Sequence, residues 1–206
     1  MTKKELIELL EKTLQEIPNQ IDGVHRAWKY FSDLQHHDTQ KIEVQRKLYD
    51  LTLYVELMNG DFTVLFHQFL SSSLIYERKY AMAKLYPLMN EGFKHLYGFV
   101  SKTGEVTIRQ DSKWNDIESI LPLMNAEEKL LYESLLNTLE QKASFSWWKE
   151  ERNDEIHLNA AGIYDHRCKQ DDEDRAIKDA MSFYEIMTKT TALCSKMASR
   201  LFIAEK

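Results

Sequence analysis

The sequence predicts an all-helical protein, and three features of its composition and pattern support this. Only six of the 206 residues are Gly and three are Pro, whereas sandwiches and barrels need turn residues about every 8 to 12 positions. Hydrophobic residues make up 43% and charged residues 29% of the chain, so it is not a disordered chain as a whole. Apolar residues recur at intervals of three and four, as in amphipathic helices. We expect an up-and-down helical bundle with additional N-terminal helices.

The N-terminal part, residues 1–60, is predicted to be a helical extension that packs on the bundle. A first apolar stripe stops at Pro18, where we expect the first helix to end because proline lacks the backbone N–H that helix continuation requires. A second helix is expected over about residues 21–37. A third follows it and is predicted to end at Gly60, since glycine is common just after a helix.

The remaining chain, residues 61–206, is predicted to form the bundle. A long helical pattern begins at Asp61 and extends to about Tyr97, and Pro87 is expected to kink this helix or divide it in two. Residues 101–112 contain a glycine and alternate apolar with polar residues. This segment therefore predicts a loop with at most a short hairpin.

Other helix ends carry local signals. Thr2 and Glu5 have the spacing of a capping box, in which each side chain bonds to the backbone N–H of the other residue. A short helix is expected over residues 114–121, before a proline, and Asn125 is expected to cap the helix that follows. A last amphipathic helix is predicted over about residues 177–204.

Charge and cysteine content limit the classes of function. The formal net charge of -6 excludes a protein that coats nucleic acid by bulk attraction, so any contact with RNA must be local. Cys168 and Cys194 lack the spacing of metal ligands, which favours reduced thiols in a cytoplasmic protein. The N-terminus has no continuous apolar segment typical of a signal peptide, and the most apolar run, residues 62–76, is too short and polar to span a membrane.

The strongest candidate for chemistry lies in a segment with a helical pattern, residues 147–169. Arg152 and His157 are five positions apart there. An arginine holds a phosphate through two hydrogen bonds, and a histidine titrates near neutral pH and can move a proton. In RNA cleavage, such a histidine would take the proton of a 2′-hydroxyl while the arginine stabilises the charge that develops on the phosphate.

An Arg, a polar residue, three further residues and a His, late in a helical chain, resemble the motif of the HEPN superfamily of helical-bundle ribonucleases. The residues concerned read Arg152-Asn153-Asp154-Glu155-Ile156-His157. The resemblance implies a homodimer that brings two Arg/His pairs together, RNA cleavage without a metal or other cofactor, and frequently a role in toxin–antitoxin or phage-defence systems, with an antitoxin as partner. It implies that Arg152 and His157 are catalytic and that Asn153 is the polar residue after the arginine.

The spacing sets a geometric condition on this site. On an uninterrupted helix, residues five apart point about 140° away from each other. The two side chains therefore meet only if the helix begins after Arg152 or if the site is completed across a dimer. His157 and Tyr164 fall along one helical stripe, so Tyr164 is a candidate substrate-binding residue, although ordinary core packing explains the same stripe.

Two alternatives remain open from the residues alone. Arg152 can pair with Glu151 or Glu155 on a solvated face, in which case the chain is a non-catalytic helical module that binds a protein or nucleic acid. The other is a metal-dependent helical-bundle hydrolase, because acids stand three residues before His25, His36 and His157. A nucleotide pyrophosphohydrolase belongs to the same alternative, and its candidate magnesium ligands are Glu151, Glu155, Asp171 and Asp174.

Overall fold

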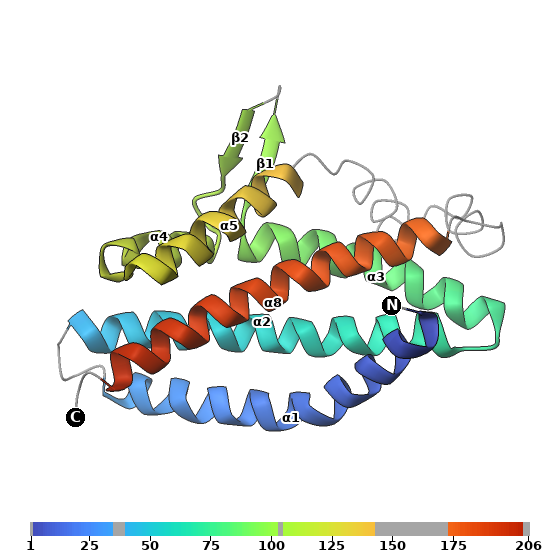
Figure 1. The fold of residues 1–206 in the computed structure, drawn as a ribbon, viewed down its shortest axis with the longest axis horizontal. Helices are drawn as coiled ribbons and strands as arrows, with labels where there is room; N and C mark the ends of the chain where they lie inside the picture. Colours follow the sequence, from blue (N-terminus) through green and yellow to red (C-terminus); the bar gives the residue numbers. More distant parts are fainter. Residues whose placement is uncertain (1, 35–39, 103–104, 143–172, 204–206) are drawn as a thin grey trace. The chain divides into compact units, whose positions relative to one another are not determined.

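The computed structural model describes residues 2–34, 40–102, 105–142 and 173–203. These residues form helices and one short hairpin, joined by turns. The long helices are α1 (Lys3–Asp33), α2 (Gln40–Ser71), α3 (Ile75–Leu96) and α8 (Glu173–Ile203) (Figure 1). The shorter elements are β1 (Phe99–Lys102), β2 (Glu105–Ile108), α4 (Trp114–Ile120), the 3-10 turn η1 (Leu121–Leu123) and α5 (Ala126–Lys142). The predicted all-α bundle is confirmed.

The prediction that the first helix ends at Pro18 is wrong, because α1 continues through this proline to Asp33. A proline inside a helix costs about 3 kcal/mol. The apolar stripe that precedes Pro18 continues after it at the same three-and-four spacing, so one helical face stays apolar along the whole of α1. This stripe comprises Leu10, Leu14, Ile17, Ile21, Val24, Trp28 and Phe31.

The prediction that a helix ends at Gly60 is also wrong. Helix α2 passes through Gly60, and the break comes later, after Ser71. A glycine inside a helix costs only about 1 kcal/mol, and the buried stripe of α2 continues from Met58 to Phe62 and Phe66. In the turn between α2 and α3, the hydroxyl of Ser72 accepts a hydrogen bond from the backbone N–H of Leu74 at 3.1 Å.

Several predicted helix ends are confirmed. At the start of α1, the Thr2 N–H donates to Glu5 at 2.7 Å and the Glu5 N–H donates to Thr2 Oγ1 at 3.3 Å. At the start of α5, Asn125 and Glu128 form a second reciprocal box with both distances at 2.9 Å. Pro87 lies inside α3 and does not divide it.

The predicted short hairpin is confirmed and leaves α3 through a glycine turn. Strands β1 and β2 are antiparallel, with Phe99 opposite Ile108. Gly98 has a φ of 66°, which is unfavourable for residues with a Cβ. A Cβ at this position would also lie 2.5 Å from the Cβ of Ser112, so only glycine fits the turn.

The described residues fall into two compact units, each built from several stretches of the chain. Unit 1 contains residues 2–17, 58–93 and 173–184. Its core is aromatic: Phe62 lies 5.4 Å from Phe66 and 5.5 Å from Phe183, measured between ring centroids. Gly92 lies on α3, and an added Cβ there would lie 2.0 Å from the sulfur of Met58 on α2. The close packing of α3 against Met58 therefore depends on the absence of a side chain at Gly92.

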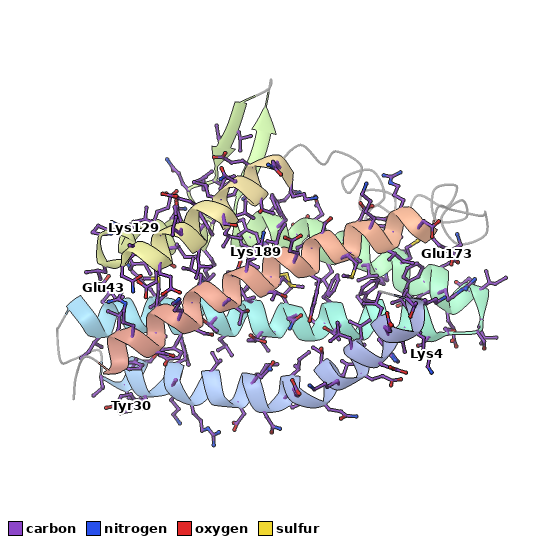
Figure 2. All side chains as sticks on the ribbon, in the orientation of Figure 1. Lys4, Tyr30, Glu43, Lys129, Glu173 and Lys189 are labelled. Atoms are coloured by element: carbon purple, nitrogen blue, oxygen red, sulfur yellow. The ribbon has the colours of Figure 1, made fainter. Side chains whose placement is uncertain are left out.

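Unit 2 contains residues 18–34, 40–57, 94–102, 105–142 and 185–203. Trp114 is fully buried and stacks on Tyr132 at a centroid distance of 5.3 Å. Lys189, labelled in Figure 2, donates to Thr138 Oγ1 at 3.3 Å and so links α8 to α5. The predicted boundary between the N-terminal extension and the bundle follows residue 60, and α2 runs through this position without a break.

Unit 2 also buries the thiol of Cys194, which gives a test of its core. Burial raises the pKa of Cys194 to about 12, although a hydrogen bond with Thr52 opposes this shift. Since the thiolate is the reactive form, we expect alkylation at pH 8 to be slower than for an exposed thiol by about a thousandfold or more. The rate should be measured in a Cys168→Ser variant, with and without urea. Fast alkylation without urea would contradict a buried Cys194.

Candidate functional site

The residues predicted to be catalytic lie outside the described residues. Arg152, Asn153, His157 and Tyr164 all belong to the segment 143–172, which connects α5 to α8. Their assignment therefore stays a prediction. The described part of the chain offers a different site, which the sequence did not indicate.

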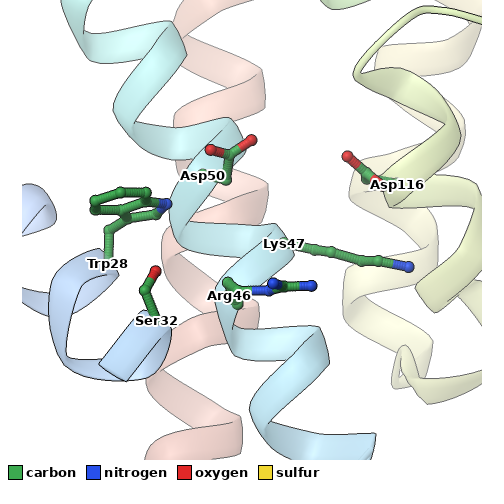
Figure 3. A pocket seen from close by; sticks show the side chains of 6 residues that line it. All are labelled: Trp28, Ser32, Arg46, Lys47, Asp50 and Asp116. Atoms are coloured by element: carbon green, nitrogen blue, oxygen red, sulfur yellow. The ribbon is translucent and has the colours of Figure 1, made fainter. Parts of the chain in front are cut away.

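This second site is a pocket of about 450 Å³ in unit 2. Helix α1 contributes Trp28 and Ser32, which are four residues apart and so lie on one face of the helix. Helix α2 contributes Arg46, Lys47 and Asp50, and α4 contributes Asp116. Figure 3 shows the long side chains of Arg46 and Lys47 extending toward α4, and the carboxylate of Asp116 pointing back toward α2.

Two of the charged groups in the pocket already have partners. Lys47 forms an ion pair with Glu43 at 3.1 Å and lies 3.4 Å from Ser119 Oγ. Asp50 is paired with Lys113, which precedes α4. Each ion pair contains one positive and one negative group and so adds little net charge to the pocket. The contacts of Lys47 with Ser119 and of Asp50 with Lys113 link α2 to the region of α4.

Arg46 and Asp116 differ from these pairs. Within the described residues, neither the guanidinium of Arg46 nor the carboxylate of Asp116 has a hydrogen bond or an ion pair. Both side chains are half-buried, so each has lost part of its hydration without gaining a partner among the described residues. An unpaired cation and an unpaired anion that line one pocket can both be satisfied by a ligand with an anionic group and a hydrogen-bond donor.

Trp28 supplies the apolar surface of the pocket. Its indole is half-buried and stacks on His25, with ring centroids 5.9 Å apart and an angle of 18° between the planes. A half-exposed indole is a surface on which a flat ligand can stack.

A buried charge cluster elsewhere in unit 2 is structural. The carboxylate of Glu128 is fully buried and accepts hydrogen bonds from Arg200 Nε at 2.7 Å and Nη2 at 2.8 Å. Desolvation raises the pKa of Glu128, but the hydrogen bonds from Arg200 and from the Asn125 N–H outweigh it, so the pKa lies below its ordinary value. Arg200 also donates to the carbonyl of Leu123 at 2.7 Å. With its oxygens engaged in this way, the carboxylate has little capacity left for a substrate.

The metal alternative gains no support from the described residues. Among them, no group of three or more His, Cys, Asp or Glu side chains is close enough together to hold a metal ion. Of the acid–histidine pairs noted in the sequence, Asp22 pairs with Arg26 at 3.0 Å and His25 stacks on Trp28. His36 and His157 lie outside the described ranges.

Comparisons with protein-family models, curated proteins and solved structures find no match for this chain. As for membranes, none of the helices in the described ranges combines the length and the apolar character that crossing a bilayer requires.

The sequence did not point to the pocket, because its residues come from three separate stretches of the chain. Arg46, Trp28 and Asp116 each resemble an ordinary residue on an amphipathic helix. Only the packing of α1, α2 and α4 places them around one cavity. The four-residue spacing of Trp28 and Ser32 was the one local signal, and this spacing is common on helices.

Proposed function

We propose that the protein is a metal-independent endoribonuclease of HEPN type that uses Arg152 and His157. The observation that carries this proposal is the Arg-Asn-x-x-x-His sequence, which precedes the last helix of an all-helical chain. The helical bundle supports it, since this is the fold that the resemblance implies. A homodimer, an antitoxin partner and a role in defence belong to the same proposal.

The proposed reaction requires one proton acceptor and one fixed cation. His157 takes the proton from a ribose 2′-hydroxyl, and the 2′-oxygen forms a bond to the adjacent phosphorus. The bond from phosphorus to the 5′-oxygen breaks, and that oxygen takes up a proton to leave as a hydroxyl. Arg152 stabilises the negative charge on the phosphate oxygens during the transfer. The products are a 2′,3′-cyclic phosphate and a 5′-hydroxyl end.

The products and the metal requirement test this proposal together. We expect the purified protein to cut single-stranded or transfer RNA in the presence of EDTA, because the chemistry needs only side chains. Product ends should be analysed by their response to a phosphatase and to a 5′-kinase. Cleavage that EDTA stops, or products with 5′-phosphate ends, would refute the mechanism.

A second candidate is a non-catalytic helical module. The pocket favours it, because Arg46 and Asp116 have no partner among the described residues and can bind a ligand without any contribution from the motif. Under this alternative, RNA or a smaller ligand is bound and remains intact.

A further inference from the structure

We propose that the pocket of unit 2 binds a ribonucleotide, with its phosphate on Arg46 and Lys47, its base on Trp28 and its ribose on Asp116. The inference concerns residues distant in sequence from Arg152 and His157. Recognition of a free nucleotide does not depend on the proposed function, whereas recognition of a nucleotide within an RNA chain rests on it.

The cationic side of the pocket fits a phosphate. The guanidinium of Arg46 has no partner within the described ranges. It carries five N–H donors, and two of them can bind two oxygens of one phosphate at the same time. The Lys47 ammonium lines the same pocket, and after its contacts with Glu43 and Ser119 one of its three N–H donors is left for a phosphate oxygen. In Figure 3 the side chains of Arg46 and Lys47 both extend toward α4.

Asp116 argues against a bare inorganic anion. An ionised carboxylate only accepts hydrogen bonds and repels a phosphate, so a ligand that occupies the whole pocket must bring a donor to it. Ribose hydroxyls are such donors, and carboxylates bind the ribose 2′-hydroxyl in dinucleotide sites. A 2′-hydroxyl is also the group by which a protein distinguishes RNA from DNA.

The size and the aromatic surface of the pocket agree with this ligand. A volume of about 450 Å³ lies in the range of small-molecule sites, roughly 300 to 1,000 Å³. Stacking of one base on an aromatic side chain contributes about 1 to 3 kcal/mol and tolerates different bases. Trp28 is half-buried in the pocket, so part of its indole is accessible to a base.

The test uses the full-length His157→Ala protein, so that binding is measured without cleavage. Calorimetric titrations should compare AMP, 2′-deoxy-AMP, inorganic phosphate and a short oligoadenylate RNA. We expect saturable binding of AMP, of the oligonucleotide or of both, with the 2′-deoxy nucleotide bound about fivefold or more weakly. Binding of AMP identifies free nucleotides as ligands, and binding of the oligonucleotide alone identifies RNA.

Pocket variants connect the binding to the named residues. Arg46→Ala and Trp28→Ala should each weaken binding by about tenfold or more. In Asp116→Ala the difference between AMP and 2′-deoxy-AMP should disappear. Arg26→Ala is the matched control, because Arg26 is an exposed α1 arginine that does not line the pocket, and it should bind as the parent protein does. Circular dichroism should confirm that each variant is folded.

Two results would overturn the inference. One is the absence of saturable binding of AMP and of the oligonucleotide up to about 1 mM. The other is binding that folded Arg46→Ala and Trp28→Ala proteins retain unchanged. Neither result bears on cleavage by Arg152 and His157, and a protein that binds AMP but cuts no RNA would refute only the proposed function.

Discussion

The His157→Ala variant is expected to cleave RNA at least about a hundredfold more slowly than the wild type, because acid–base catalysis by a side chain contributes about 10² to 10⁴ in rate. The loss should appear in the rate constant at saturating RNA, since the imidazole acts on the proton and adds little to binding. Single-turnover cleavage of an end-labelled RNA measures this constant directly.

Two further variants separate catalysis from folding. Arg152→Lys keeps the positive charge but loses the paired hydrogen-bond geometry of the guanidinium, and it should be impaired as well. His95→Ala is the matched control, because His95 is an exposed histidine on α3, and it should cut at the wild-type rate. Wild-type activity in a folded His157→Ala protein would exclude this histidine from the reaction.

The Arg200→Ala variant is expected to lower the free energy of unfolding by about 3 kcal/mol. This change leaves the fully buried Glu128 carboxylate without its cation, and breaking a buried ion pair on one side costs about 3 to 5 kcal/mol. The lower end of this energy range applies because the side chain of Arg200 is 36% exposed, so water screens part of the interaction. Urea unfolding followed by circular dichroism measures the loss. The exposed Arg26→Ala control should change stability by less than about 0.5 kcal/mol.

The pH dependence of this effect follows from the lowered pKa of Glu128. A carboxyl group whose pKa is lower in the folded state stabilises the protein above its unfolded pKa, and that stability is lost as the pH falls through the folded pKa. The difference between wild type and Arg200→Ala should therefore be full at pH 7 and shrink below about pH 4. A difference that stays constant from pH 7 to pH 3 would contradict the charge interaction.

Sequence reasoning located the features that depend on neighbouring residues. The capping box at Thr2, the cap at Asn125, the short hairpin and the end of α4 before a proline are all local, and the structure confirms them. Sequence reasoning failed at Pro18 and Gly60, where the free-energy cost of one proline or glycine competes with burial of apolar side chains along the whole helix. Packing of a continuous apolar stripe outweighs one missing hydrogen bond or one flexible residue.

The two candidate sites differ in how far they can be recognised from the sequence alone. Arg152 and His157 lie within one short segment, so a spacing rule could find them. The pocket joins Trp28, Arg46 and Asp116, and its distinguishing property is that Arg46 and Asp116 have no partner in the part of the chain that the structure describes. A missing partner depends on the positions of all surrounding side chains, which periodicity does not give.

The interleaved chain order of the two units constrains when they can fold during translation. Unit 1 needs residues 173–184 and unit 2 needs residues 185–203, so each takes its last segment from α8. A nascent chain that ends before α8 therefore lacks part of both cores, including Phe183 and Arg200. Neither unit is complete before α8 is made, in contrast to proteins whose domains follow one another along the chain and fold in turn. The apolar helix faces that α8 covers in both units therefore stay exposed on a nascent chain until this helix has been synthesised.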